Sequence, residues 1–249
     1  MLRPRIIPCL LIQNKGLVKT VNFSNPKYLG DSINTVRIFN ELEVDELLFL
    51  DINATKEQRK PNLSILSNIA NECFMPLGYG GGIQDSDEAK KIFDTGFEKV
   101  SINTSAFLYP NLISDISKIF GSQSLMVSID YKKNIFGEYS VYIKGGKKNI
   151  KMHPAKWAKE AENRGAGEIL LTSISKEGTW KGLDLELINE VVDAVNIPVI
   201  AHGGAGNLSH IKSALSNPSL SAVGLGSMVV FQKEGMGVLV NFPKFSQKE

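Results

Sequence analysis

Two apolar segments of related pattern end differently, and one of them ends on a carboxylate. Residues 125–130 end on Asp130, whereas residues 5–12 carry Leu11 at the corresponding position. A carboxylate at the end of a buried strand can act as a general acid or base, whereas leucine cannot transfer a proton. We therefore predict Asp130 as the catalytic residue, supported by Asp51 at the end of another apolar segment.

Each half of the chain contains a glycine cluster and, one strand later, a loop with a hydroxyl side chain. The two copies of this pattern are separated by the same number of residues. Backbone N–H groups in such turns converge on an oxyanion, and a helix that starts there favours negative charge. Glycines that merely permit tight turns are the plainer alternative. The repetition favours two phosphate sites, one for each end of a long substrate. The first site consists of Gly81, Gly82, Asn103 and Thr104, and the second of Gly203, Gly204, Gly226 and Ser227.

A long first loop is expected at residues 13–30, and such loops are often mobile lids. Lys19 lies in this loop, where it is able to close on a phosphate, although a solvated lysine is the plainer interpretation. Thr172 lies in the sixth apolar segment and Gly178 follows that segment, and the two residues complete the predicted substrate-binding set.

Charged residues open four of the apolar segments, at the end opposite to Asp130. Because side chains alternate along a strand, all four share the face of the residues predicted to point inward. Inward charges are costly unless they are paired, and their balanced signs predict a ring of ion pairs that closes the floor of the fold. Any one of these charged residues, taken alone, would be interpreted as a solvent-exposed residue at the end of a strand. The four residues are Arg5, Glu46, Lys99 and Glu168.

Eight apolar runs alternate with amphipathic helical patterns along the whole chain, which is typical of a parallel sheet. Eight such units in 249 residues predict an α/β fold, a single (βα)8 TIM barrel spanning 1–249. A doubly wound sheet is the alternative, but no glycine fingerprint follows the first strand. The two halves of the chain, about 1–122 and 123–249, repeat the same strand and glycine pattern, which predicts two half-barrels.

The composition excludes several classes of function. The net charge of +2 is too small to imply nucleic acid or a membrane surface. The three histidines and two cysteines show no metal-ligand spacing, so we expect neither a metal nor a cofactor. Two cysteines in a chain of this length suggest a reducing compartment, and we expect a cytoplasmic protein.

The sequence resembles the cyclase subunit of imidazole glycerol phosphate synthase along essentially its whole length. The matching stretches, in order, are residues 5–10, 44–52, 80–83, 99–103, 120–123, 164–174 and 203–206. The resemblance implies a lyase that forms a heterodimer with a glutaminase subunit, whose ammonia passes through the charged ring to a bisphosphate substrate. It places the four floor charges at the ring, Asp130 at one of two catalytic aspartates, and Asn103, Thr104, Ser227 and the glycine clusters at phosphate positions.

The resemblance breaks at the acid/base end. Leu11 stands at the other catalytic aspartate, Ser175 and Glu177 stand where aspartate is usual, and His202 replaces a small hydroxyl residue. These departures resemble the paralogous barrel of bacterial surface-polysaccharide pathways. There, barrel and glutaminase supply ammonia to a third enzyme, which amidinates a nucleotide sugar.

Three hypotheses follow. The leading one is an ammonia-conducting subunit of a glutamine amidotransferase complex that serves a sugar amidotransferase. The second is a cyclase of histidine biosynthesis that works with Asp130 and a recruited residue such as His202 on a phosphorylated small molecule. The third is a non-catalytic barrel that binds and activates its glutaminase without conducting ammonia.

Overall fold

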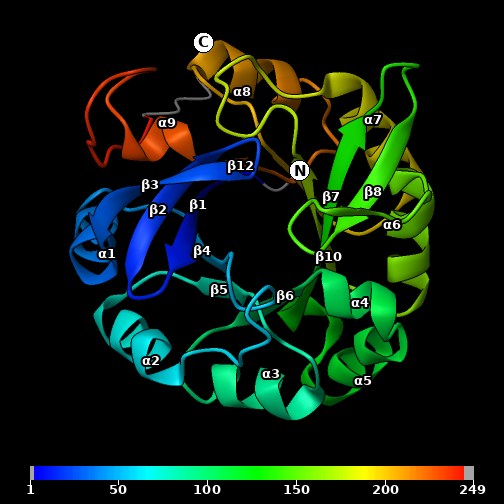
Figure 1. Ribbon diagram of the computed structural model, residues 1–249, viewed down its shortest axis with the longest axis horizontal. Helices are drawn as coiled ribbons and strands as arrows, with labels where there is room; N and C mark the ends of the chain where they lie inside the picture. The colour runs from blue at the N-terminus through cyan, green and yellow to red at the C-terminus, as the bar shows by residue number, and fades with distance from the viewer. Residues whose placement is uncertain (1–2, 244–249) are drawn as a thin grey trace.

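The computed structural model describes residues 3–243 and shows eight parallel strands closed into a barrel (Figure 1). Each strand pairs with the next, and the last pairs with the first. This closure confirms the predicted (βα)8 barrel and excludes the alternative, an open doubly wound sheet. The ends of the predicted domain, residues 1–2 and 244–249, lie outside the described residues. In spatial order the strands are β1 (Arg5–Gln13), β4 (Leu47–Asp51), β5 (Leu77–Gly80), β6 (Lys99–Ile102), β7 (Leu125–Lys133), β10 (Glu168–Ser173), β11 (Val199–His202) and β12 (Ala222–Leu225).

The strands form because their side chains are buried on both faces, in two separate apolar clusters. One face of each strand packs outward against the helices, in a large core that includes Phe39, Phe49 and Trp157. The other face fills the barrel interior with a smaller cluster, so a strand carries apolar residues almost without interruption. The interior cluster comprises Ile7, Cys9, Leu48, Met126, Leu170, Ile200 and Ala222.

Helices surround the barrel in Figure 1, and several start at a residue that can cap them. The side chains of Asp31, Asn62, Asp85 and Asn207 each accept a hydrogen bond from a backbone N–H in the first turn. No helix within residues 3–243 is both long enough and apolar enough to cross a membrane. The helices are α1 (Ser32–Glu41), α2 (Leu63–Glu72), α3 (Ser86–Phe93), α4 (Thr104–Leu108), α5 (Asn111–Phe120), α6 (Pro154–Asn163), α7 (Leu185–Ala194), α8 (Leu208–Leu215), α9 (Ser227–Val230) and the 3-10 turn η1 (Ser122–Ser124).

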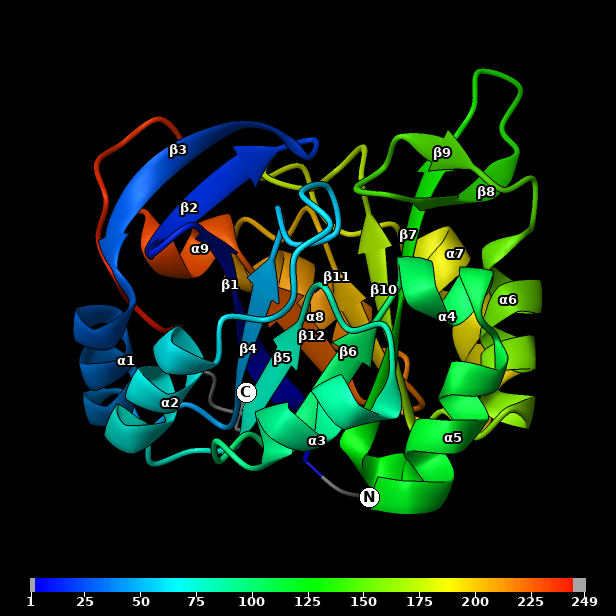
Figure 2. The same cartoon turned by 60° about the horizontal axis from the view of Figure 1, so that its bottom comes forward.

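Two β-hairpins extend the barrel at the end to which its strands point (Figure 2). Strand β1 continues into β2 (Gly16–Val21) and β3 (Ser24–Asp31), and β7 continues into β8 (Tyr139–Ile143) and β9 (Lys148–Asn149). Residues 13–30, expected as a loop, therefore form mainly a hairpin. The reason is local, because Asn14 at φ 57° makes a two-residue turn and Leu17 and Val18 are buried. The first strand of each half-barrel thus carries a hairpin.

Candidate functional site

The four charges at the floor of the barrel join in a closed ring of ion pairs. Arg5 contacts both Glu46, at 2.6 Å from Nη1 to Oε2, and Glu168. Lys99 contacts the same two carboxylates, with Nζ 3.1 Å from Glu46 Oε1 and 2.9 Å from Glu168 Oε2. Each cation thus lies between two anions, and each anion between two cations. The structure brings all four predicted residues together, while their role in admitting ammonia stays a prediction.

The ring separates solvent from the barrel interior. The two carboxylates are buried, at 3% exposure for Glu46 and 5% for Glu168, whereas Arg5 and Lys99 are partly exposed. Directly inside lies the apolar interior cluster, with Ala222 in register with Arg5 on the neighbouring strand. Buried charges are stable only when paired, so this interior disfavours an ammonium ion far more than neutral ammonia.

At the open end, three polar side chains form one row across adjacent strands. Thr172 is in register with Asp130 of β7 on one side and with His202 of β11 on the other. Side chains in register point to the same face of a sheet, and here that face is the barrel interior. Thr172 Oγ1 lies 3.2 Å from His202 Nδ1. The row places a carboxylate and an imidazole on either side of one hydroxyl.

Asp130 is a buried carboxylate with one side-chain donor. Asn103 Nδ2 donates to Asp130 Oδ2 at 3.0 Å and to the Ser128 carbonyl at 3.1 Å, which fixes the amide between the two. Burial raises the pKa of Asp130 to about 7, and the hydrogen bond from Asn103 opposes this shift only partly. A carboxyl group that titrates near neutral pH is suited to proton transfer.

Leu11 offers Asp130 no partner for proton transfer. Leu11 is in register with Leu50 of β4 and Val18 of β2, and its side chain is 8% exposed. The side of the barrel mouth built by β1 and β4 is therefore apolar here. The structure leaves Asp130 without a carboxylate at this position of the first half-barrel.

His202 stands in the interior row but is poorly suited to replace a carboxylate. Burial, and to a smaller extent the charge of Lys19, lower the pKa of His202 to about 3. The imidazole is thus neutral at neutral pH and a weak base. A general acid or base acts best when its pKa lies near the working pH, so His202 is poorly matched to that role.

The first glycine cluster lies beside Asn103 and Thr104 because β5 pairs with β6. A side chain at Gly82 would collide with the Arg59 carbonyl, since its Cβ would lie 2.7 Å from that oxygen at a φ of 75°. Asp51 holds the loop that contains Arg59 in place over the glycine cluster. Its Oδ1 accepts hydrogen bonds from the backbone N–H groups of residues 53 and 54, and Arg59 Nη2 lies 2.9 Å from its Oδ2. Asp51 therefore shapes the first site through its own loop.

The second glycine cluster surrounds a narrow cavity of about 10 Å³. It is lined by Gly178, Gly203, Gly204, Gly226 and Ser227 together with Lys19, Glu177 and His202, so the structure brings this whole predicted set together. Lys19 is buried and ion-paired with Glu177, a contact between residues 158 positions apart. Sequence reasoning missed this pairing, and the only signal was a glutamate before Gly178.

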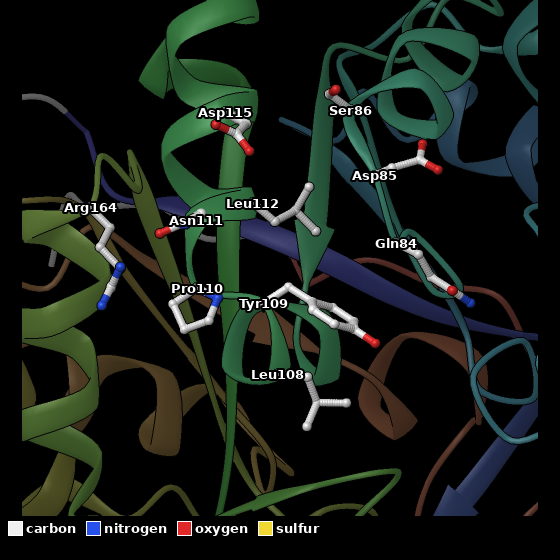
Figure 3. Close-up of a pocket in the computed structure, with 10 residues that line it drawn as sticks. All are labelled: Gln84, Asp85, Ser86, Leu108, Tyr109, Pro110, Asn111, Leu112, Asp115 and Arg164. Atoms are coloured by element: carbon white, nitrogen blue, oxygen red, sulfur yellow. The ribbon is translucent and has the colours of Figure 1, made fainter.

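A larger hollow lies away from these residues, on the outside of the barrel. Figure 3 shows its lining: Gln84 to Ser86 at the start of α3, Leu108 to Leu112 at the corner between α4 and α5, and Asp115 and Arg164. The hollow measures about 570 Å³ and is open to the surface. It contains none of the predicted site residues. Within residues 3–243, no group of three or more His, Cys, Asp or Glu side chains is arranged to hold a metal.

The fold and the site together define a (βα)8 barrel with a charged ring at one end and an acid beside glycine-rich turns at the other. Residues 5–234 match the family model described as histidine biosynthesis protein, and the chain belongs to that family. A Pseudomonas aeruginosa protein, provisionally named imidazole glycerol phosphate synthase subunit hisF2, is 47% identical over 243 residues, covering 98% of this chain and 97% of the relative.

Other relatives carry the same family name. A Leptospira borgpetersenii protein provisionally named imidazole glycerol phosphate synthase subunit HisF is 44% identical over 250 residues, covering 100% of this chain and 98% of its own. A Streptococcus mutans protein named imidazole glycerol phosphate synthase subunit HisF is 43% identical over 211 residues, covering 85% of this chain and 84% of its own. The chain is thus a HisF-like member of the imidazole glycerol phosphate synthase cyclase family.

Proposed function

We propose that this protein is the ammonia-conducting barrel of a glutamine amidotransferase complex. It binds a glutaminase subunit at its floor and delivers ammonia to an enzyme that amidinates a nucleotide sugar for a surface polysaccharide. The observation that carries this proposal is a complete ion-pair ring beneath an incomplete acid/base pair. The floor, where ammonia would enter, has all four charged residues of the ring. The open end, where cyclisation would take place, lacks one member of the acid/base pair.

The interior supports transport of ammonia in its neutral form. Ammonia that passes the ring meets Ile7, Leu48, Leu170 and Ile200 before it reaches the polar row at Asp130. A charged ammonium ion would lose its hydration there without gaining a partner, so the apolar layer selects the nucleophilic form. One link of the ring has to open for each passage, since the four side chains close it in this structure.

A cyclase that works with Asp130 and His202 is the second candidate, and the row through Thr172 favours it. The row places both groups at the mouth of the barrel, on either side of one hydroxyl. The low pKa of His202 argues against it, because an imidazole with a pKa of about 3 is a weak base and carries no acidic imidazolium proton at neutral pH. We therefore favour ammonia delivery, with a phosphorylated ligand held at Gly81, Gly82, Asn103 and Thr104.

A plug inside the ring tests ammonia conduction. Ala222 is fully buried in the interior cluster, so Ala222→Phe fills the barrel just above Arg5. The assay uses the barrel together with the glutaminase subunit and the sugar-amidating enzyme of the proposed complex. We expect glutamine-dependent product formation to fall about tenfold or more, while formation from added ammonium salt and hydrolysis of glutamine persist.

The control for the plug is Ala194→Phe, a similar enlargement at the end of α7 on the outside of the barrel. It should leave glutamine-dependent transfer unchanged. Undiminished transfer in a folded Ala222→Phe protein would rule out conduction through the barrel and leave a glutaminase-activating role. Thermal unfolding of both variants shows whether the enlarged side chain is accommodated.

A further inference from the structure

Glu177 places a carboxylate in the second glycine cluster, where the sequence pattern favours an anion. The side chain is 2% exposed. Its Oε1 accepts from Lys19 and from Thr20 Oγ1 at 3.1 Å, and its Oε2 accepts from the Phe23 N–H at 3.1 Å. An internal carboxylate thus receives a cation, a hydroxyl and a backbone N–H, which are the kinds of donor that bind a phosphate group.

The β2–β3 hairpin seals this cluster from above. Lys19 lies directly over Gly226, since a Cβ at Gly226 would be 2.8 Å from Lys19 Cε. Asn22 ties the hairpin to the loop after β10: its N–H donates to the Glu177 carbonyl at 2.9 Å, and its Nδ2 donates to the Ser175 carbonyl at 2.7 Å. These bonds hold Lys19 and Glu177 in the cluster together.

The space that remains is too small for a phosphate group. The cavity of about 10 Å³ is at the lower limit for a single water molecule. Charge opposes an incoming phosphate as well: Glu177, one methylene longer than the aspartate usual at this position in the family, brings its carboxylate onto Lys19 inside the cluster, where the phosphate would have to lie. Entry of an anion therefore requires Glu177 to give up Lys19 and leave the cluster.

The first cluster has no equivalent of Glu177. In the internal repeat that aligns Leu47 with Ile169, the residue equivalent to Glu177 is Thr55, which is uncharged and exposed. The nearby carboxylate, Asp51, is neutralised by Arg59. The two clusters are thus alike in glycines but differ in whether an acid fills them.

We propose that Glu177 is a built-in anion that occupies the second cluster, so that the barrel binds a phosphate only at the first. A ligand at the open end of the barrel then belongs to the class with a phosphate at one end, and a bisphosphate is excluded while Glu177 holds Lys19. This specificity does not depend on the ammonia route, because it concerns only anion binding at the open end.

Titration with inorganic phosphate, followed through backbone amide NMR signals, tests this assignment. In the wild-type protein, we expect the signals of Gly204, Gly226 and Ser227 to stay unchanged as phosphate is added. Glu177→Ala frees both space and Lys19, so phosphate should shift these three signals and bind at least tenfold more tightly than to the wild type. Phosphate should also raise the melting temperature of this variant, since it replaces the lost carboxylate.

Two further variants keep the test decisive. Glu177→Gln retains the size of the side chain and removes only its charge, so it should fold even if Glu177→Ala does not and should show a smaller gain. Glu138→Ala removes an exposed glutamate near the tip of the β7–β8 hairpin and should match the wild type. Wild-type signals of Gly204 and Gly226 that respond to phosphate as strongly as those of the variants would overturn the proposal. So would folded Glu177 variants that gain no binding.

Discussion

The two ends of the barrel differ in how completely their polar groups are paired. At the floor, each of the four charges contacts two partners of opposite sign. At the open end, Asp130 has a single side-chain donor, and Leu11, at the equivalent position of the first half-barrel, lies beside Leu50 and is apolar. The open end thus has a carboxylate that titrates near neutral pH at Asp130 and an apolar side chain at Leu11.

This difference separates two functions that a single barrel can combine. A ring of paired charges and an apolar interior are enough to control the entry of a small neutral molecule. Ring closure of a substrate requires positioned acids and bases as well. A chain with the first set and half of the second is suited to delivering ammonia to another active site.

The largest effect is expected at the floor. Arg5→Ala leaves Glu46 and Glu168 buried with only Lys99 between them, so we expect a loss of about 3 kcal/mol in the free energy of unfolding, measured with urea. Arg37→Ala is the matched control, since Arg37 pairs with Glu72 on the exposed surface and its removal should leave the free energy of unfolding nearly unchanged. Equal losses in both variants would show that the ring is an ordinary set of surface ion pairs.

At the open end, Leu11 should limit cyclisation. We expect the wild-type barrel with ammonium salt to consume the bisphosphate nucleotide substrate of the family at least ~10²-fold more slowly than a relative with both aspartates. In a Glu177→Ala background, in which the second cluster can admit a phosphate, Leu11→Asp should raise that rate, whereas Leu11→Asn, similar in size and unable to transfer a proton, should not. Turnover at the relative's rate by the wild type would favour the cyclase hypothesis.

Asp130 should make the stability of the protein depend on pH. Because burial raises its pKa from 3.8 to about 7, the folded state binds a proton more tightly than the unfolded chain. This contribution to stability is complete below about pH 4 and is lost as the pH rises through about 7. Asp130→Asn does not undergo this loss, so between pH 4 and pH 6 its free energy of unfolding in urea should rise relative to the wild type by on the order of 2 kcal/mol.

The matched control is Asp94→Asn, which changes an exposed aspartate at the end of α3. Its stability should follow the pH profile of the wild type. Parallel profiles for Asp130→Asn and the wild type would mean that Asp130 titrates like an exposed carboxyl group.

Strand patterns and strand parity made much of this arrangement predictable. The apolar runs predicted the number of barrel strands, and the runs at 5–12 and 125–130 match β1 and β7 to within three residues. Alternation placed Arg5 and Glu168 on the inner face. The break between α4 and α5 at Tyr109 and Pro110 was not predicted. The hairpin after β1 was expected as a loop, although Asn14 carried the turn signal.

Contacts between distant loops were beyond the reach of sequence patterns. The pairing of Lys19 with Glu177 and the hydrogen bond from the Lys144 N–H to Thr104 Oγ1 depend on how two hairpins fold back over the barrel mouth. Neither strand period nor turn composition fixes that geometry. The glycines located both clusters, but only the structure shows that one of them holds a carboxylate.

The source of the nitrogen in the amidinated product tests ammonia conduction most directly. The complete complex is given glutamine labelled with ¹⁵N in its amide group, together with an excess of unlabelled ammonium. If ammonia passes through the barrel without mixing with solvent, most of the amidinated product carries ¹⁵N. Ala222→Phe should then lower the ¹⁵N-labelled fraction of the product toward the labelled fraction of the free ammonium. A wild-type product that matches the free pool would contradict the account.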